Sequence, residues 1–311
     1  MSGAGVDRPA SAASAGAASG ETLVHPSHSA LAARGGRGVR VAVIDSGIHA
    51  GHPHVGGLAG AVAFDDRGRI ADDVVDRLGH GTAVAAAIHE KAPEAELHVA
   101  KVFDATLSTT VLALKRALEW AGESGARLVN LSLGTPRAEH EGVLAPVVAE
   151  LASGGCLVVS ARHDQGRTWW PGSLPAAVGV TLDWETPRDG VVVEPFEEGL
   201  RLRASGYPRP IPGVHPDRNL RGVSFAVANA TGVLARALEG RDGIRSAGAL
   251  AALLLDAQFL ESGKVELDVP VLGHVKATSA LPFDIGVVLV VVGLVLVVLE
   301  TLGAEAEEGT R

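Results

Sequence analysis

Short apolar runs alternate with helical patterns along most of the chain, and this alternation constrains the fold more than any other feature. Strands are expected at 39–45, 95–103, 126–133, 156–161 and 176–182. Helices are expected at 80–88, 108–125, 142–155, 224–238 and 244–257. Continuously apolar strands are typical of parallel sheets that are covered on both faces. The pattern therefore predicts an α/β fold of three layers, a mainly parallel sheet between helices. Ligands of such folds bind at the carboxyl ends of the strands.

Composition narrows the class of protein further. The 311 residues are 47% hydrophobic, which is enough for a large core, and carry a net charge of −9. An acidic chain is a poor candidate for broad nucleic-acid binding, which needs a basic face. Cys156 is the single cysteine and lies in an apolar run. It is expected to be buried and structural, because it has no partner for an internal disulfide.

Three polar residues stand at the ends of predicted elements, where a site would form. Asp45 ends the first strand, while His80 and Ser224 begin helices. Serine hydrolysis needs a hydroxyl beside an imidazole that takes its proton, and an acid that orients the imidazole. A helix start also favours the negative charge that develops in such a reaction. Asp45 and Ser224, each taken singly, would more often be a helix or turn cap than a catalytic residue, so the assignment depends on the surrounding motifs.

The segments around these residues resemble the subtilisin-like serine proteases, or subtilases. The matching motifs are Asp45-Ser46-Gly47-Ile48 with His52-Pro53, the run 80–85, and Gly222, Ser224, Ala226 and Gly232. Segments 92–104, 128–135 and 170–180 also match, in the order of the family. The order Asp, His, Ser is that of subtilisin. The resemblance implies a subtilisin-like catalytic domain over 23–278 and a serine endopeptidase that forms an acyl-enzyme. Ser224 would be the nucleophile, His80 the general base and Asp45 the orienting acid.

The chain departs from the family where an asparagine side chain normally completes the oxyanion hole. The segment here is "SARHDQG" (160–166), and direct alignment places His163 at that position, whereas a one-residue shift places Asp164 there. An imidazole can donate a hydrogen bond, so His163 is the tentative second donor beside the Ser224 N–H. Losing this donor in subtilisin costs about 10²–10³ in kcat. The alternative hypothesis is a membrane-tethered pseudo-protease that binds peptides or a partner protein and does not cut.

The resemblance also assigns residues to the substrate. Segment Ser132, Leu133 and Gly134 would pair with the substrate backbone as an added strand. The same segment and the segment after the oxyanion strand would form the walls of the pocket for the residue before the scissile bond, and Trp169 would lie at its floor. Ala161 is a further predicted substrate-binding residue. A bulky indole there predicts a preference for small side chains such as Ala or Gly. Val223, Ala228 and Asn229 depart from the family motif around Ser224 and are interpreted as packing positions.

No cofactor and no metal site is predicted. His49, His52 and His54 are loosely spaced for zinc, and the second falls on a motif of the family. Structural calcium occurs in many subtilases, but the acids Asp65, Asp66, Asp72 and Asp73 match no clear calcium loop. A solvated surface is the favoured interpretation of those acids.

Both ends of the chain differ in composition from the catalytic domain. Residues 1–22 are rich in Ala, Ser and Gly and lack the pattern of a secretory signal, so a disordered segment is expected. The run 285–299 is uncharged, and the span 281–302 approaches the ~20 residues of a transmembrane helix. We predict a membrane anchor at 281–302, an acidic tail at 303–311, and a catalytic domain on the cytoplasmic side. The competing interpretation packs the run onto the domain. The predicted partners are a protein or peptide substrate and a lipid bilayer, without nucleic acid.

Overall fold

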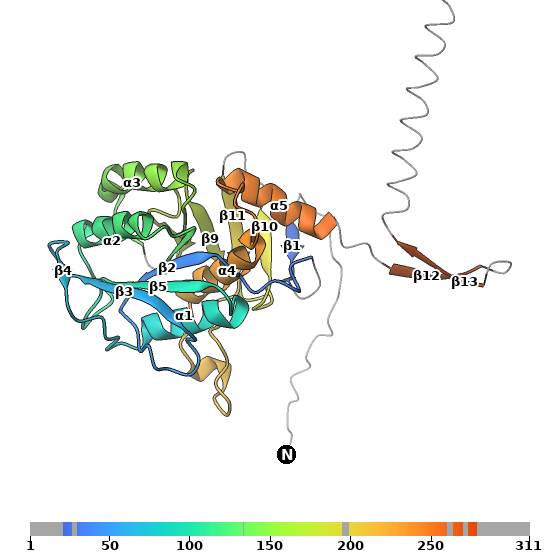
Figure 1. Cartoon of the computed structure of the whole chain (residues 1–311), viewed down its shortest axis with the longest axis horizontal. Helices are drawn as coiled ribbons and strands as arrows, with labels where there is room; N and C mark the ends of the chain where they lie inside the picture. The colour runs from blue at the N-terminus through green and yellow to red at the C-terminus, as the bar shows by residue number, and fades with distance from the viewer. Residues whose placement is uncertain are drawn as a thin grey trace, which may run out of the picture.

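The computed structural model describes residues 21–26, 30–132, 134–194, 199–259, 264–269 and 273–278 (Figure 1). Leu133, nearly all of the predicted N-terminal segment, the apolar run at 281–302 and the acidic tail lie outside these residues. Within the described part of the chain, no helix is both long and apolar enough to cross a membrane. The predicted anchor therefore stays a prediction.

An 11-stranded sheet forms the middle of the domain. Its parallel part runs in the order β11 (Leu200–Ala204), β9 (Val178–Leu182), β7 (Leu157–Asp164), β6 (Leu128–Leu131), β2 (Arg40–Asp45), β5 (Glu96–Lys101) and β3 (Leu58–Phe64). Antiparallel strands extend it: β10 (Val191–Glu194) and β1 (Thr22–Val24) at one edge, β4 (Ile70–Ala71) at the other, and β8 (Arg167–Thr168) against β7. β12 (Lys264–Val269) and β13 (Gly273–Thr278) pair separately.

Helices cover both faces of this sheet, as the alternating pattern predicted (Figure 1). On one face, α2 (Val111–Glu123) and α3 (Glu141–Ser153) share a cluster of buried apolar side chains with the strands. On the other face, α1 (His80–Lys91), α4 (Val223–Leu238) and α5 (Ala247–Phe259) share a second cluster. α4 is buried over nearly its whole length, so Ser224 begins a helix that is held firmly by the core.

Some boundaries differ from those predicted from the sequence. α2 begins later than expected, because Thr110 rather than Ser108 or Thr109 is the cap: its Oγ1 accepts the Ala113 N–H at 3.1 Å. β7 continues beyond the expected end at residue 161, because β8 folds back against it. β3, β10 and β11 were not predicted as strands. β3 contains a glycine, β11 carries two arginines and the apolar part of β10 is only three residues long, so none shows the longer apolar run that identifies the buried parallel strands.

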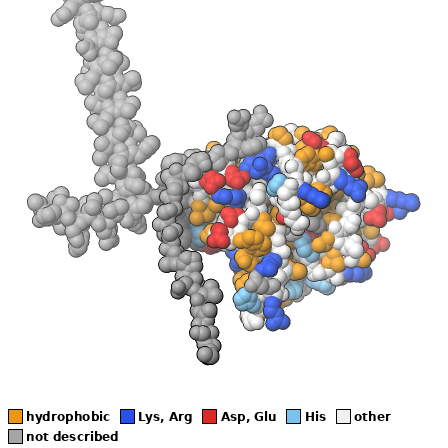
Figure 2. Space-filling model, turned by 180° about the vertical axis from the view of Figure 1, so that it is seen from behind, with side chains coloured by type: hydrophobic (Ala, Val, Ile, Leu, Met, Phe, Trp, Pro, Cys, Tyr) orange, Lys and Arg blue, Asp and Glu red, His pale blue; other side chains and the backbone are white. Residues whose placement is uncertain are grey.

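The surface of the domain mixes residue types. On the face shown in Figure 2, basic, acidic and hydrophobic side chains are interspersed over the described residues. That face therefore carries no continuous basic surface of the kind that nucleic-acid binding requires.

Candidate active site

Asp45 and His80 are in direct contact at the carboxyl end of the sheet. Asp45 ends β2 and is fully buried, and His80 begins α1. The imidazole Nδ1 lies 2.7 Å from Asp45 Oδ1. Gly81 allows this approach, because a Cβ at that position would stand 2.4 Å from the Gly47 carbonyl oxygen. The glycine of the HGT motif is thus required by the packing of the start of α1 against the loop after β2.

A second buried acid, Asp76, supports this pair and was missed in the sequence. Its carboxylate accepts hydrogen bonds from Ser46 Oγ at 2.8 Å and from Thr82 Oγ1 at 2.7 Å. It also accepts the backbone N–H groups of Gly79 and Thr82, both at 2.8 Å. Ser46 Oγ in turn accepts the Gly81 N–H at 2.9 Å. Asp76 therefore ties the loop after β2 to the first turn of α1.

The carboxylates of Asp45 and Asp76 raise the pKa of His80, as a residue that accepts a proton requires. Burial by itself would lower the pKa of His80, but the hydrogen bond and charge of Asp45, with the charge of Asp76, raise it above the usual value. Burial likewise opposes ionisation of Asp76, yet the hydrogen bonds from Thr82, Ser46 and Gly79 lower the pKa of its carboxyl. Two anionic groups thus stabilise an imidazolium at His80.

Ser224 is the second residue of α4. The turn before it requires glycine, since Gly222 has a φ of 143°. The phenyl ring of Phe225, the next residue, lies 5.8 Å from the His80 ring, measured between centroids. Among the described residues, no hydrogen bond joins Ser224 Oγ to His80. Such catalytic contacts are often long without substrate. The Ser224 N–H, in the first turn of a helix, has no intrahelical acceptor and is available to a ligand.

Buried amides connect α4 with the neighbouring segments. Asn229 donates to the carbonyls of Ser205 at 2.7 Å and Tyr207 at 3.0 Å, which fixes the chain that enters the turn before Ser224. Asn229 is therefore more than the packing residue that the sequence predicts, because its side-chain amide holds two backbone carbonyls. Further along, Thr231 donates to Asn130, and Asn130 donates to Ser132 Oγ at 2.8 Å. One helix thus positions both Ser224 and the proposed substrate segment.

His163, the tentative oxyanion donor, lies near the end of β7 in a hairpin with β8. It pairs with Thr168 across the hairpin, and its side chain is exposed. The regular register of β7 against β9 is interrupted at Arg162, whose guanidinium lies 3.5 Å from Glu194. Among the described residues, no hydrogen bond holds the His163 imidazole. Sequence and structure therefore agree that this position lacks the fixed amide of the family.

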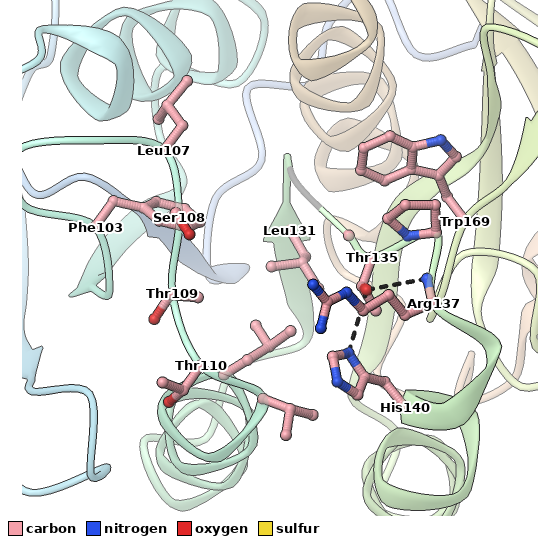
Figure 3. Close-up of a pocket in the computed structure, with 14 residues that line it drawn as sticks. Phe103, Leu107, Ser108, Thr109, Thr110, Leu131, Thr135, Arg137, His140 and Trp169 are labelled. Carbon is pink, nitrogen blue, oxygen red and sulfur yellow. Dashed lines mark hydrogen bonds between the residues drawn. The ribbon is translucent and has the colours of Figure 1, made fainter.

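The predicted substrate segment borders a cavity of about 320 Å³, shown in Figure 3. Thr135 and Trp170 exchange backbone hydrogen bonds of 2.8 and 2.9 Å beside it. A Cβ at Gly134 would lie 2.5 Å from the Trp170 carbonyl oxygen and 3.5 Å from the Trp169 ring, so the indole packs closely over this glycine. Ser132 and Ala161 are buried.

Several of the histidines and acids that the sequence offers as metal ligands contact other protein groups instead. No cluster of three or more His, Cys, Asp or Glu that could hold a metal occurs among the described residues. The His54 N–H donates to His52 Nδ1 at 3.2 Å. Asp65 forms an ion pair with Arg69 at 2.7 Å. Hydrogen bonding to Arg77 is the main influence that lowers the pKa of Asp73 to about 2.

Comparison with known families gives two matches. The subtilase family matches residues 36–180, which contain Asp45, His80 and the proposed substrate segment. A domain related to the MnhB subunit of a Na⁺/H⁺ antiporter matches residues 234–297. The second match begins within α4 and continues through most of the apolar run near the C-terminus.

Curated relatives and solved structures point in the same direction. Subtilisin Savinase of Lederbergia lenta is 33% identical over 213 residues, covering 63% of this chain and 71% of that protein. An alkaline protease of Alkalihalobacillus alcalophilus is equally identical, with 50% of that protein covered. A cold-adapted subtilisin-like serine proteinase superposes with a TM-score of 0.53 at 20% identity, covering 71% of this chain and 82% of that one. The prenylagaramide maturation protease PagA gives 0.51 at 23% identity, with 73% and 84% covered.

Proposed function

The chain belongs to the subtilase family and is a subtilisin-like serine endopeptidase, and we propose that Ser224, His80 and Asp45 are its catalytic triad. The observation that carries this assignment is the 2.7 Å contact between buried Asp45 and His80. The phenyl ring of Phe225, which follows Ser224, lies 5.8 Å from the His80 ring between centroids, and this proximity supports the assignment of Ser224.

In this proposal, Ser224 Oγ attacks the scissile carbonyl carbon while His80 Nε2 takes its proton. Asp45 accepts the Nδ1–H hydrogen bond and stabilises the imidazolium. The carbonyl oxygen becomes an oxyanion that the Ser224 N–H binds. His80 then returns the proton to the leaving amine as the C–N bond breaks. Water next hydrolyses the acyl-enzyme, with His80 again as base.

We further propose that His163 donates the second hydrogen bond to the oxyanion. Two observations support this role: His163 lies at the carboxyl end of β7, and no other described residue forms a hydrogen bond with its imidazole. A second candidate function, a pseudo-protease that binds peptides, is favoured by the same departure from the family asparagine.

A fluorophosphonate probe separates the two functions, because it reacts only with an activated serine. The folded wild-type protein is expected to be labelled at Ser224, and the variants Ser224→Ala and His80→Ala are expected to remain unlabelled. Wild-type protein that is folded yet unlabelled would contradict the protease assignment and favour the binding function.

We also propose limited processing of a protein or precursor peptide, with a small residue before the scissile bond. The close packing of Trp169 over Gly134 supports a shallow pocket for that residue. PagA, a structural neighbour, is a maturation protease. Profiling with a peptide library is expected to show cleavage after Ala or Gly. A preference for Leu or large aromatic residues would contradict the shallow pocket.

The membrane anchor at 281–302 remains part of the proposal, with the catalytic domain on the cytoplasmic side. Its support is the uncharged run itself and the antiporter-related match that covers most of it. Extraction of membranes at alkaline pH checks this: the full chain should stay with the lipid, and a chain ending at residue 278 should not. Release of both would contradict the anchor.

A further inference from the structure

The cavity beside the proposed substrate segment has two chemically different walls (Figure 3). One wall is mainly apolar and comes from the segment that leads into α2, with Phe103, Leu107 and Val111. The opposite wall is polar and comes from the segment between β6 and α3, with Thr135, Arg137 and His140. A ligand in this cavity would contact hydrocarbon on one side and hydrogen-bond donors on the other.

Backbone groups on both sides of the cavity are open to a peptide. Residues 105–109 form no backbone hydrogen bond with any described residue, and the same holds for Gly134. An extended peptide could join these two segments as an additional strand. Alternate side chains of such a strand would then point into the cavity. This placement rests on the proposed protease function, because the peptide is its substrate.

The described lining of the cavity includes the guanidinium of Arg137 and no carboxylate. The guanidinium of Arg137 points into it in Figure 3. The one ion pair of Arg137 among the described residues is with Glu139 at 3.8 Å, and both side chains are about 70% exposed. Such a pair is weak and easily exchanged.

The surroundings of Arg137 also suit a negatively charged ligand. No Asp or Glu is among the described residues that line the cavity. The nearby Glu141 is held outside it by a 3.0 Å hydrogen bond from Trp170 Nε1. Both α2 and α3 begin at its wall, after Thr110 and His140, and the positive ends of their dipoles add to the charge of Arg137. His140 Nδ1 lies 3.2 Å from Thr135 Oγ1, which keeps the imidazole at the same wall.

We propose that this cavity is a specificity pocket for an acidic side chain of the substrate, located a few residues before the scissile bond. Arg137 would bind the carboxylate of that aspartate or glutamate, since guanidinium and carboxylate can form two parallel hydrogen bonds. The apolar wall would contact the methylene groups of the same side chain. The protease would thus read an acid in the sequence that precedes its cleavage site.

Matched peptides that differ only in Glu or Gln at one position test this pocket with the full chain. The Glu/Gln pair is placed in turn at each position before the scissile bond. At the position that reaches the cavity, kcat/KM for the Glu peptide should exceed that for the Gln peptide about 5- to 100-fold in wild-type protein. Arg137→Gln should bring the ratio to about one, and Arg137→Lys should leave part of it. Arg37→Gln removes an equal charge at the amino end of the sheet and should leave the ratio unchanged. Raising the salt concentration should reduce the wild-type ratio, because salt screens exposed ion pairs.

Binding to the Ser224→Ala variant measures the pocket without catalysis. The Glu peptide should bind this variant more tightly than the Gln peptide, and the added change Arg137→Gln should equalise the two dissociation constants. Equal affinity in Ser224→Ala, or a ratio unaffected by Arg137→Gln, would overturn the pocket. If wild-type protein cut neither peptide while Ser224→Ala still discriminated between them, the pocket would stand and the proposed catalysis would fail.

Discussion

The two halves of the proposed site are built differently. Around His80, buried Asp45 contacts the imidazole, buried Asp76 holds the first turn of α1, and the charges of both favour the charged imidazole. Around His163, an exposed hairpin carries an imidazole that no described residue holds. Electrostatic catalysis is strongest where the groups are preorganised. The contact between Asp45 and His80 is therefore fixed by the fold, whereas the proposed oxyanion half has the Ser224 N–H and an imidazole that no described residue positions.

The largest effect is expected from breaking the preorganised half. Ser224→Ala and His80→Ala should each lower kcat by about 10⁴–10⁶-fold, because nucleophile and base act as one unit. Hydrolysis of a peptide that the wild-type protein cuts is the measurement, and the double variant should be no slower than either single one. Residual activity within tenfold of wild type would place the triad elsewhere.

Substitutions in the oxyanion half should lower kcat less than those in the triad, and the effect should depend on whether the new side chain can donate a hydrogen bond. His163→Ala should lower kcat by about 10²-fold with little change in KM, since the donor acts in the transition state. His163→Asn should restore or exceed wild-type activity by supplying a side-chain amide. Single-turnover kinetics of both variants checks this. If Ala and Asn at this position both behave as wild type, His163 is not the donor.

Removing Asp76 should affect stability more than chemistry. Asp76→Ala leaves the buried hydroxyls of Ser46 and Thr82 and several backbone N–H groups without their acceptor, at a cost of about 2–4 kcal/mol. Urea unfolding measures the loss, and Asp76→Asn should lose less because one acceptor oxygen remains. Asp65→Asn, a change at an exposed ion pair, is the matched control and should cost under ~1 kcal/mol. Equal losses of unfolding free energy in Asp76→Asn and Asp65→Asn would show that the Asp76 hydrogen bonds contribute little to stability.

The smallest effect is a shift in pH dependence. Because Asp45 and Asp76 raise the pKa of His80, the acid limb of kcat/KM should have its midpoint above pH 6.5. Activity is lost as the pH falls through that midpoint, since the neutral imidazole is the base. Asp45→Asn should move the midpoint to lower pH, and Asp76→Asn should move it less in the same direction. His163 variants should leave it in place. A midpoint that is unchanged in Asp45→Asn would contradict this account.

Much of the fold could be predicted because its signals are local. Continuous apolar strands and helical periodicity around residues 39–257 gave the mainly parallel sheet and the helix positions, and the motifs around Asp45 and His80 gave the family. β3, β10 and β11 were missed, because a glycine, a very short apolar run or alternating arginines interrupt the pattern of a buried strand. Asp76 left one signal, an acid followed by Gly79 three residues later, which is typical of a turn in which the carboxylate accepts backbone N–H groups.

The sequence by itself determined the element types, the family and the order of the residues proposed for catalysis. Only the tertiary structure decided that Asp76 binds Thr82 and Ser46, that Asn229 holds the carbonyls of Ser205 and Tyr207, and that Arg137 points into a cavity opposite Phe103. Hydrophobic periodicity and short motifs report on residues that are close together in the sequence. The contacts that shape the site join segments far apart in sequence, and their geometry is set by strand register and by how the helices pack on the sheet.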